Sequence, residues 1–229
     1  MTESEPLPDS GGRPDTGADR AALDAVLPED LAGRDAFLDA AALHLSLLRE
    51  KNRSLNLTRI IEPEEAAVKH VLDSLLGLPH LGSARSVLDL GTGAGFPGVP
   101  LALARPDLKV YLVESTRKKA VALQEFVDQL GLGEDRVCVH PVRAEQLLRE
   151  MPVDLVVARA AGSASTLLKL LGPVRRAWRR CLMYKGPNVH EERDEARSEA
   201  TRLGLSCELH EAVSLPDDRG TRCFLHYSR

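Results

Sequence analysis

The chain has 229 residues with a formal net charge of −4, and 43% of its residues are hydrophobic and 28% charged. These proportions are typical of globular proteins, so they exclude wholesale disorder, a collagen-like repeat and a disulfide-dense miniprotein. No run reaches the roughly 18 apolar residues of a membrane helix, and the acidic start lacks the basic and apolar regions of a signal peptide. We therefore expect one soluble, cytoplasmic domain with accessory segments.

The charge is distributed unevenly along the chain. Residues 1–30 hold eight acids and two arginines, a net charge of −6, and residues 188–218 hold nine acids and three arginines, again −6. Residues 31–187 therefore carry +5 and residues 219–229 carry +3. This distribution permits a polyanionic partner on a locally basic face, although dedicated nucleic-acid-binding domains are usually more basic overall.

The cysteines show no regular spacing. Cys138, Cys181, Cys207 and Cys223 include no CxxC pair and no metal-ligand spacing to the seven histidines. Zinc clusters and disulfide frameworks both depend on such spacing. We expect reduced thiols and no metal site.

The first part of the chain predicts a tail followed by helices. Residues 1–30 are too acidic and too rich in proline and glycine to bury a face, which indicates a disordered tail. Apolar residues then recur at helical spacing over 37–48, and a second helix is expected after Pro63. We expect a helical extension over residues 31–80 and the main domain over residues 81–229.

Beyond the extension, short apolar runs alternate with helical stretches. The predicted strands are 86–90, 109–114, 136–140, 153–158 and 181–184, and the predicted helices between them are 97–104, 117–130, 144–150 and 163–179. This alternation indicates an α/β fold with a mostly parallel, Rossmann-like sheet covered on both faces. After a polar helix over 191–203, runs at 206–213 and 222–227 are expected to pair antiparallel at the C-terminal edge of the sheet.

The strongest local signal is a glycine-rich loop after the first predicted strand. It reads Leu88-Asp89-Leu90-Gly91-Thr92-Gly93-Ala94-Gly95-Phe96-Pro97-Gly98. Such a loop lets a cofactor lie against the strand end and the helix N-terminus. Gly93, Gly95 and Gly98 also fit the G-x-G-x-x-G pattern, and Glu114 has the spacing of a ribose-binding acid. The loop alone is therefore compatible with a nicotinamide or flavin dinucleotide and with S-adenosylmethionine.

Two residues favour S-adenosylmethionine. Asp89, two residues before Gly91, resembles the acid in the first motif of Rossmann-like methyltransferases, where it orients the loop and the amino-acid end of the cofactor. Pro97 removes an amide that a pyrophosphate would bind at the helix start, a loss that is harmless for a cofactor without phosphate. A methyltransferase is therefore the favoured interpretation.

The segment after the fourth predicted strand, which usually meets the acceptor in this fold, narrows the choice of acceptor. It contains no D/N-P-P-aromatic run of the kind used for exocyclic amines, and the nearest cysteines lie in or at the start of predicted strands, not at this turn. An acceptor with its own lone pair, such as guanine N7, needs neither this motif nor a cysteine nucleophile. These absences restrict the class of acceptor without identifying it.

Six segments together resemble one family. They are 55–58 (LNLT), 70–75 (HVLDSL), 89–100 (DLGTGAGFPGVP), 142–145 (VRAE), 157–160 (VARA) and 184–186 (YKG). This set resembles the bacterial small-subunit (16S) ribosomal RNA guanine-N7 methyltransferases, also called glucose-inhibited division protein B. The resemblance covers about residues 55–187. It implies a class I fold and transfer of a methyl group from S-adenosylmethionine to a guanosine of 16S ribosomal RNA, and we expect a monomer.

The resemblance also implies roles for residues of the cofactor site. Gly91 and Phe96 would contact the methionine and adenosyl portions, Glu114 the ribose hydroxyls, and Ala144 and Glu145 the adenine. Asp89, Gly93 and Gly95 complete the expected cofactor loop.

Four cationic residues are implied at the acceptor side. Arg159 would lie beside the methionine end and the target base as the catalytic residue, whereas Lys118, Arg143 and Lys185 would contact RNA phosphates. No metal is implied.

Three other functions stay open. They are a methyltransferase of the same fold that acts on a small molecule or protein, a dinucleotide oxidoreductase, and a non-catalytic ribosomal RNA-binding assembly factor.

Two further patterns have alternative interpretations. Arg175, Arg176, Arg179 and Arg180 are expected on one helix beside Trp178, as a surface for RNA backbone or simply a solvated face. His70 and Asp73, one helical turn apart, are expected to brace the extension against the main domain.

Overall fold

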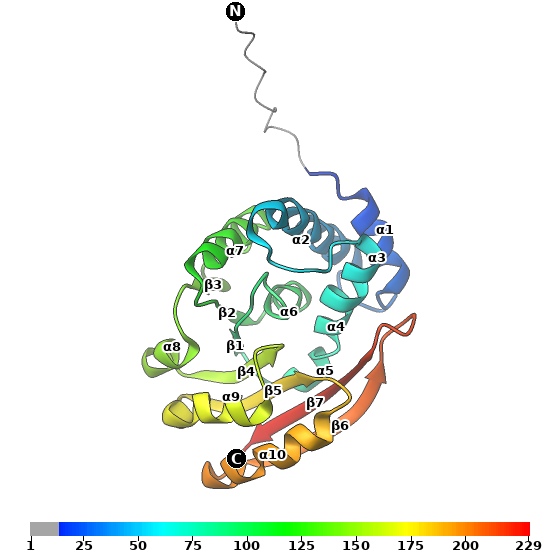
Figure 1. The fold of residues 1–229 in the computed structure, drawn as a ribbon. Coiled ribbons are helices and arrows are strands. Elements are labelled where there is room, and N and C mark those ends of the chain that lie inside the picture. Colours follow the sequence, from blue (N-terminus) through cyan, green and yellow to red (C-terminus); the bar gives the residue numbers. More distant parts are fainter. Residues whose placement is uncertain (1–13) are drawn as a thin grey trace, which may run out of the picture.

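The structure is a computed structural model that describes residues 14–229. Within these residues the chain forms a seven-stranded sheet in the order β3-β2-β1-β4-β5-β7-β6 (Figure 1). The strands are β1 (Ser86–Leu90), β2 (Lys109–Val113), β3 (Val137–His140), β4 (Val153–Arg159), β5 (Trp178–Lys185), β6 (Ser206–Ser214) and β7 (Thr221–Ser228). The first five strands are parallel, and β7 runs antiparallel between β5 and β6. The predicted sheet and its antiparallel edge are confirmed.

Helices cover both faces of this sheet. Before β1 lie α1 (Gly17–Val26), α2 (Arg34–Leu55), α3 (Pro63–Ala66), the π-helical turn η1 (Ala67–Leu72), α4 (Asp73–Leu75) and α5 (Leu78–Leu81). After β1 lie α6 (Gly98–Ala104), α7 (Arg117–Gln129), α8 (Ala144–Glu150), α9 (Ala164–Leu171), the 3₁₀ turn η2 (Gly172–Ala177) and α10 (Val189–Arg202). Figure 1 shows α2, α6 and α7 on one face and α8, α9 and α10 on the other. Within residues 14–229, none of the helices has the length and apolar character needed to span a membrane.

The central strands β1 and β4 are apolar on both sides because both faces of the sheet are buried there. Neighbouring residues of a strand point to opposite faces. Val87 of β1 accordingly packs in the core beneath α2, α6 and α7, whereas Leu88 packs in the core beneath α8, α9 and α10. Two cores on one sheet explain the continuous apolar runs that predicted a parallel sheet.

The N-terminal boundary differs from the prediction. Helix α1 lies inside the stretch predicted to be disordered, and its Leu23 is fully buried in the core shared with α2. Ion pairs neutralise the acidic residues whose number predicted disorder. Asp24 pairs with Arg34, and the buried Asp19 pairs with Arg49. The prediction is therefore wrong for residues 17–26, whereas residues 1–13 of the expected tail lie outside the described residues.

The start of β5 also differs from the prediction. The expected helix over 163–179 ends at Leu171, because Gly172-Pro173 begins a 3₁₀ turn, and β5 starts at Trp178. Arg179 and Arg180 therefore lie on a strand, where successive side chains point to opposite faces, so the expected single arginine face is wrong.

Trp178 lies in the core, against the side chain of Arg175. Its side chain is buried, and the guanidinium of Arg175 lies 4.2 Å from its ring centre. The Arg175 side chain also donates a hydrogen bond to the carbonyl of Trp178 at 2.7 Å, so at least this arginine has a structural role.

We expect Leu23→Ala to lower the free energy of unfolding by about 2–5 kcal/mol, because it leaves a cavity between α1 and α2. Urea unfolding measures this difference. Val121→Ala is the matched control, since Val121 is 52% exposed, and it should change stability by less than about 0.5 kcal/mol. Equal effects of the two substitutions would mean that α1 does not belong to the cooperative fold.

Candidate functional site

The glycine-rich loop turns at the carboxyl end of β1. Gly91, Gly93 and Gly95 have φ values of +70°, +58° and +99°, which side chains rarely adopt. A Cβ atom at Gly93 would meet nothing within 4 Å, so the backbone is open to a ligand there. At Gly98 a Cβ atom would lie 2.8 Å from a carboxylate oxygen of Asp89, so only glycine allows this close approach between α6 and β1.

Asp89 connects the strand to the helix and keeps one free acceptor. Its side chain is fully buried, and Oδ2 accepts a hydrogen bond from the amide of Gly98 at 2.7 Å. Its Oδ1 has no hydrogen-bond partner within residues 14–229. Burial raises the pKa of Asp89 to about 6, opposed in part by the Thr92 hydroxyl, the Gly98 amide and the charge of Arg159. A cationic ligand group at Oδ1 would supply the missing partner and favour the ionised carboxylate.

A cavity of about 100 Å³ lies beside this loop and is lined by four of the predicted cofactor residues, Gly91, Glu114, Ala144 and Glu145. It is lined by Leu90, Gly91, Val113, Glu114, Ser115, Val142, Arg143, Ala144, Glu145 and Leu170. The side chain of Glu114 lines this cavity, and its Oε1 accepts a hydrogen bond from the amide of Thr116 at 2.7 Å. Oε2 of Glu145 is buried without a partner among the described residues. The site thus offers carboxylate oxygens for hydroxyl or amino groups of a ligand.

The ring of Phe96 is buried against the helical extension. It is 6% exposed and stacks between His44 of α2 and His70 of η1, with ring centres 4.7 and 4.5 Å away. It does not line the cavity beside Gly91. The Phe96 ring attaches the loop to the helical extension, and its placement gives no support to direct contact with a cofactor.

The two histidines beside Phe96 are uncharged near neutral pH. Burial lowers the pKa of His44 to about 4, and burial together with the charge of Arg159 lowers the pKa of His70 to about 3. His44 donates a hydrogen bond from Nε2 to the carbonyl of Ala94 at 2.8 Å, so it fixes the glycine-rich loop from α2. His44 was not predicted from the sequence, because nothing local to α2 indicates that it faces this loop.

Arg159 is held at the end of β4 by the helical extension. Its Nη1 donates to Oδ2 of Asp73 at 2.8 Å and to the carbonyls of Lys69 and His70 at 3.1 and 3.3 Å. Arg222 of β7 donates to the same Asp73 carboxylate, at 2.5 and 2.7 Å. Asp73 is 1% exposed, so the expected brace between extension and sheet is confirmed for this residue. Arg222 is a member that the sequence analysis missed.

A second cavity, of about 300 Å³, lies against Arg159. It is lined by Ile60, Lys69, His70, Asp73, Arg159, Ala160, Leu215, Arg219, Gly220, Thr221 and Arg222. Its walls therefore come from the helical extension, the end of β4 and the turn between β6 and β7. Arginine and lysine side chains outnumber the single carboxylate of Asp73 among these residues, so the cavity suits an electron-rich ligand.

A sequence profile of the GidB family, described as rRNA small subunit methyltransferase G, matches residues 38–216. The chain belongs to this family. A Ribosomal RNA small subunit methyltransferase G of Solibacter usitatus is 42% identical, over 87% of this chain and 94% of that protein. Another, of Symbiobacterium thermophilum, is 36% identical over 89% of each chain. The family expected from the sequence is confirmed.

Solved structures agree with the fold of this GidB-family chain. A putative O-methyltransferase from Klebsiella pneumoniae has a TM-score of 0.59 at 18% identity, covering 92% of this chain and 94% of that one. Magnesium protoporphyrin IX methyltransferase from Synechocystis PCC 6803, with bound SAM, has a TM-score of 0.55 at 15% identity, covering 81% and 97%. These structures confirm the class I methyltransferase fold.

The three lysine and arginine residues predicted to contact RNA differ in exposure within this GidB-family fold. Lys118, at the start of α7, and Arg143, beside the smaller cavity, are both exposed. Lys185 is 6% exposed, donates to the carbonyl of Gly162 at 2.7 Å and forms an ion pair with Glu192 at 2.6 Å. Contact between Lys185 and a phosphate is therefore not supported by this geometry, because its ammonium group is buried and already has two partners.

The buried histidines predict a pH dependence of stability. Since the pKa of His44 is about 4 when folded and about 6.5 when unfolded, only the unfolded chain takes up this proton as the pH falls below 6.5, and stability is lost. We expect His44→Gln, which keeps a donor for Ala94, to reduce the slope of the unfolding free energy between pH 6 and 5 by about 1 kcal/mol per pH unit.

Urea unfolding over a pH series measures that slope. His190→Gln is the control, because His190 is exposed on α10, and it should leave the slope unchanged. A His44→Gln slope equal to that of the wild type would contradict burial of an uncharged His44.

Proposed function

We propose that this chain transfers the methyl group of S-adenosylmethionine to N7 of a guanosine in 16S ribosomal RNA, acting as a monomer in the cytoplasm. The observation that carries the proposal is the glycine-rich loop of a GidB-family chain, with a carboxylate-lined cavity on β1, β2 and α8 and a cationic cavity at Arg159. The first cavity suits a nucleoside with free hydroxyls, and the second suits a nucleic-acid base and its phosphates.

The residues around the loop fit S-adenosylmethionine. Glu114 would accept the ribose hydroxyls, Ala144 and Glu145 would border the adenine, and the glycines of the loop would let the cofactor approach the backbone. The free Oδ1 of Asp89 fits the ammonium group of the methionine portion. When bound, the cofactor supplies a methyl group activated by a positively charged sulfur.

The start of α6 argues against a dinucleotide. A pyrophosphate binds free backbone amides at a helix N-terminus. Here the N-cap residue Pro97 has no amide hydrogen, and the amide of Gly98 is already bound by Asp89. The start of α6 therefore lacks two of the amide donors that the pyrophosphate of a nicotinamide or flavin dinucleotide would use.

The acceptor chemistry needs positioning more than proton transfer. Guanine N7 carries a lone pair, so no side chain has to remove a proton before methyl transfer. Arg159, fixed by Asp73 and two backbone carbonyls, forms a rigid wall of the larger cavity, and in this proposal it orients the target base and the methionine end of the cofactor. The exposed Lys118 and Arg143 contact RNA phosphates in this proposal, whereas the buried Lys185 does not.

The decisive experiment is transfer of labelled methyl groups to small ribosomal subunits purified from cells that lack this protein. We expect labelled 7-methylguanosine after nucleoside digestion and mass spectrometry. Absence of label on subunits and on their protein-free RNA would overturn the proposal in favour of a small-molecule acceptor. RNA binding without any release of S-adenosylhomocysteine would overturn it in favour of an assembly factor.

Glu114→Gln tests the cofactor site separately. Because the substitution replaces a charged acceptor of the ribose hydroxyls by a neutral one, we expect S-adenosylmethionine to bind about tenfold or more weakly by calorimetry. Glu150→Gln, at an exposed position at the end of α8, is the control and should bind normally. Unchanged affinity of Glu114→Gln would exclude Glu114 from the ribose site.

A further inference from the structure

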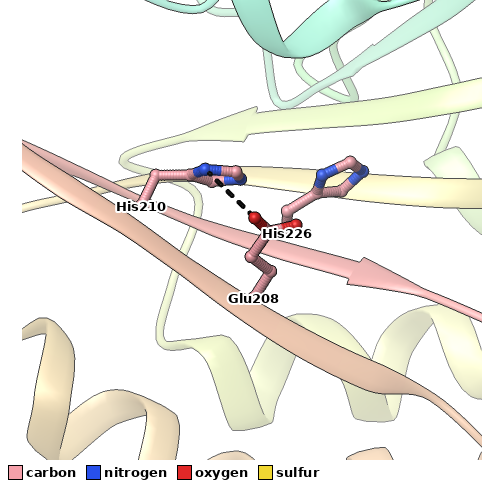
Figure 2. Close-up of side chains that lie close together, drawn as sticks. All are labelled: Glu208, His210 and His226. Atoms are coloured by element: carbon pink, nitrogen blue, oxygen red, sulfur yellow. Dashed lines mark ion pairs between the residues drawn. The ribbon is translucent and has the colours of Figure 1, made fainter.

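Three side chains with metal-binding groups meet on one face of the β6–β7 pair, away from the cavities described above. Glu208 and His210 are two residues apart on β6 and so share a face, and His226 of β7 is the register partner of Glu208. The ligand atoms of the three side chains all lie within 4.8 Å of one another. Figure 2 shows the carboxylate of Glu208 between the two imidazole rings.

The hydrogen bonding of these side chains is incomplete. The Nε2 atoms of His210 and His226 are buried and have no partner within residues 14–229. The Glu208 carboxylate is 71% exposed, and its Oε1 lies 3.7 Å from Nδ1 of His210, too far for a hydrogen bond. Buried imidazole nitrogens are normally satisfied, so two unsatisfied ones on adjacent strands indicate a missing partner.

Neighbouring side chains enclose the cluster. The ring of His80, from α5, lies 4.2 Å from the ring of His210 and 4.5 Å from that of Phe224, measured between ring centres. The positively charged Arg180 is turned toward α5, where it donates a hydrogen bond to the carbonyl of Leu81 at 2.7 Å. The cluster therefore has a covered side at α5 and an open side at the carboxylate of Glu208.

We propose that Glu208, His210 and His226 bind one Zn²⁺ ion, with water completing its coordination. Two imidazoles and a carboxylate are a known ligand set for zinc, with bonds of about 2.0–2.2 Å that place tetrahedral ligand atoms roughly 3.4 Å apart. The ligand atoms, which lie up to 4.8 Å apart, must therefore approach one another by up to about 1.4 Å on binding. The exposure of Glu208 and the lack of competing partners for the histidine nitrogens leave them free to do so.

The place of the site in the sheet indicates a structural role. β6 is the edge strand, its pairing with β7 is irregular between His210 and Val213, and the turn that follows β6 borders the larger cavity. A metal ion that joins β6 to β7 fixes this edge and the turn with it. Spacing along the sequence does not indicate this cluster, because strand pairing brings His226 to Glu208 and His210.

The test uses full-length protein without a histidine tag, stripped with a chelator and titrated with Zn²⁺ against a chromophoric competitor. We expect one Zn²⁺ per chain, a higher melting temperature with Zn²⁺, and d–d absorption bands of tetrahedral or five-coordinate Co²⁺ when Co²⁺ is substituted. Glu208→Gln and His226→Asn should each weaken Zn²⁺ binding at least tenfold and abolish the thermal shift.

The controls separate the site from other zinc-binding groups. His190→Ala, at an exposed histidine of α10, should bind Zn²⁺ as the wild type does, and circular dichroism establishes that each variant folds without metal. Glu208→Gln is the safest variant for folding, because it changes only an exposed side chain. Absence of binding, or wild-type affinity in both Glu208→Gln and His226→Asn, would overturn the proposal. Neither result depends on the proposed methyl transfer.

Discussion

The site depends on the two ion pairs that the buried carboxylate of Asp73 forms. This carboxylate binds Arg159 from β4 and Arg222 from β7 while lying on the helical extension, so one charge joins three segments of the chain. A buried charge is tolerated only when it is paired and hydrogen-bonded, and two guanidinium groups without their carboxylate would be strongly destabilising. The same pairing fixes the direction of Arg159 and therefore the wall of the larger cavity. The extension is thus part of the site and not an appendage to a complete catalytic domain.

A second set of contacts attaches the glycine-rich loop to the sheet and to the helical extension. Asp89 binds the first amide of α6 from the sheet side, and His44 and His70 stack on Phe96 from the extension side. His70 can lie close to the guanidinium of Arg159 because burial keeps this histidine uncharged. A loop that would otherwise be mobile because of its glycines is held in one conformation, which reduces the entropy that ligand binding has to overcome.

The sequence predicted the features whose signal is local. The strand, the glycines and Asp89 lie within a dozen residues, so both the loop and its cofactor class follow from them. Helix α1 was not predicted, because its acidic residues are stabilised by arginines of α2, and the end of α9 was missed although Gly172-Pro173 is a local signal for it. The orientation of Phe96, the role of Arg222 and the pairing of Lys185 depend on residues from distant segments, and no pattern within one segment contains that information. The same reason applies to Glu208, His210 and His226.

The position of β7 has a consequence for the order in which the chain folds. β7 is the last strand in sequence but lies between β5 and β6, and its Arg222 meets Asp73 across 149 residues. During synthesis β6 emerges before the strand to which it pairs, so it has no place in the sheet until β7 follows. Contacts of such large sequence separation form late, because their loop-closure entropy has to be overcome first. The nascent chain consequently completes the antiparallel edge of its sheet, and the wall of the larger cavity that the β6–β7 turn provides, only in a late step.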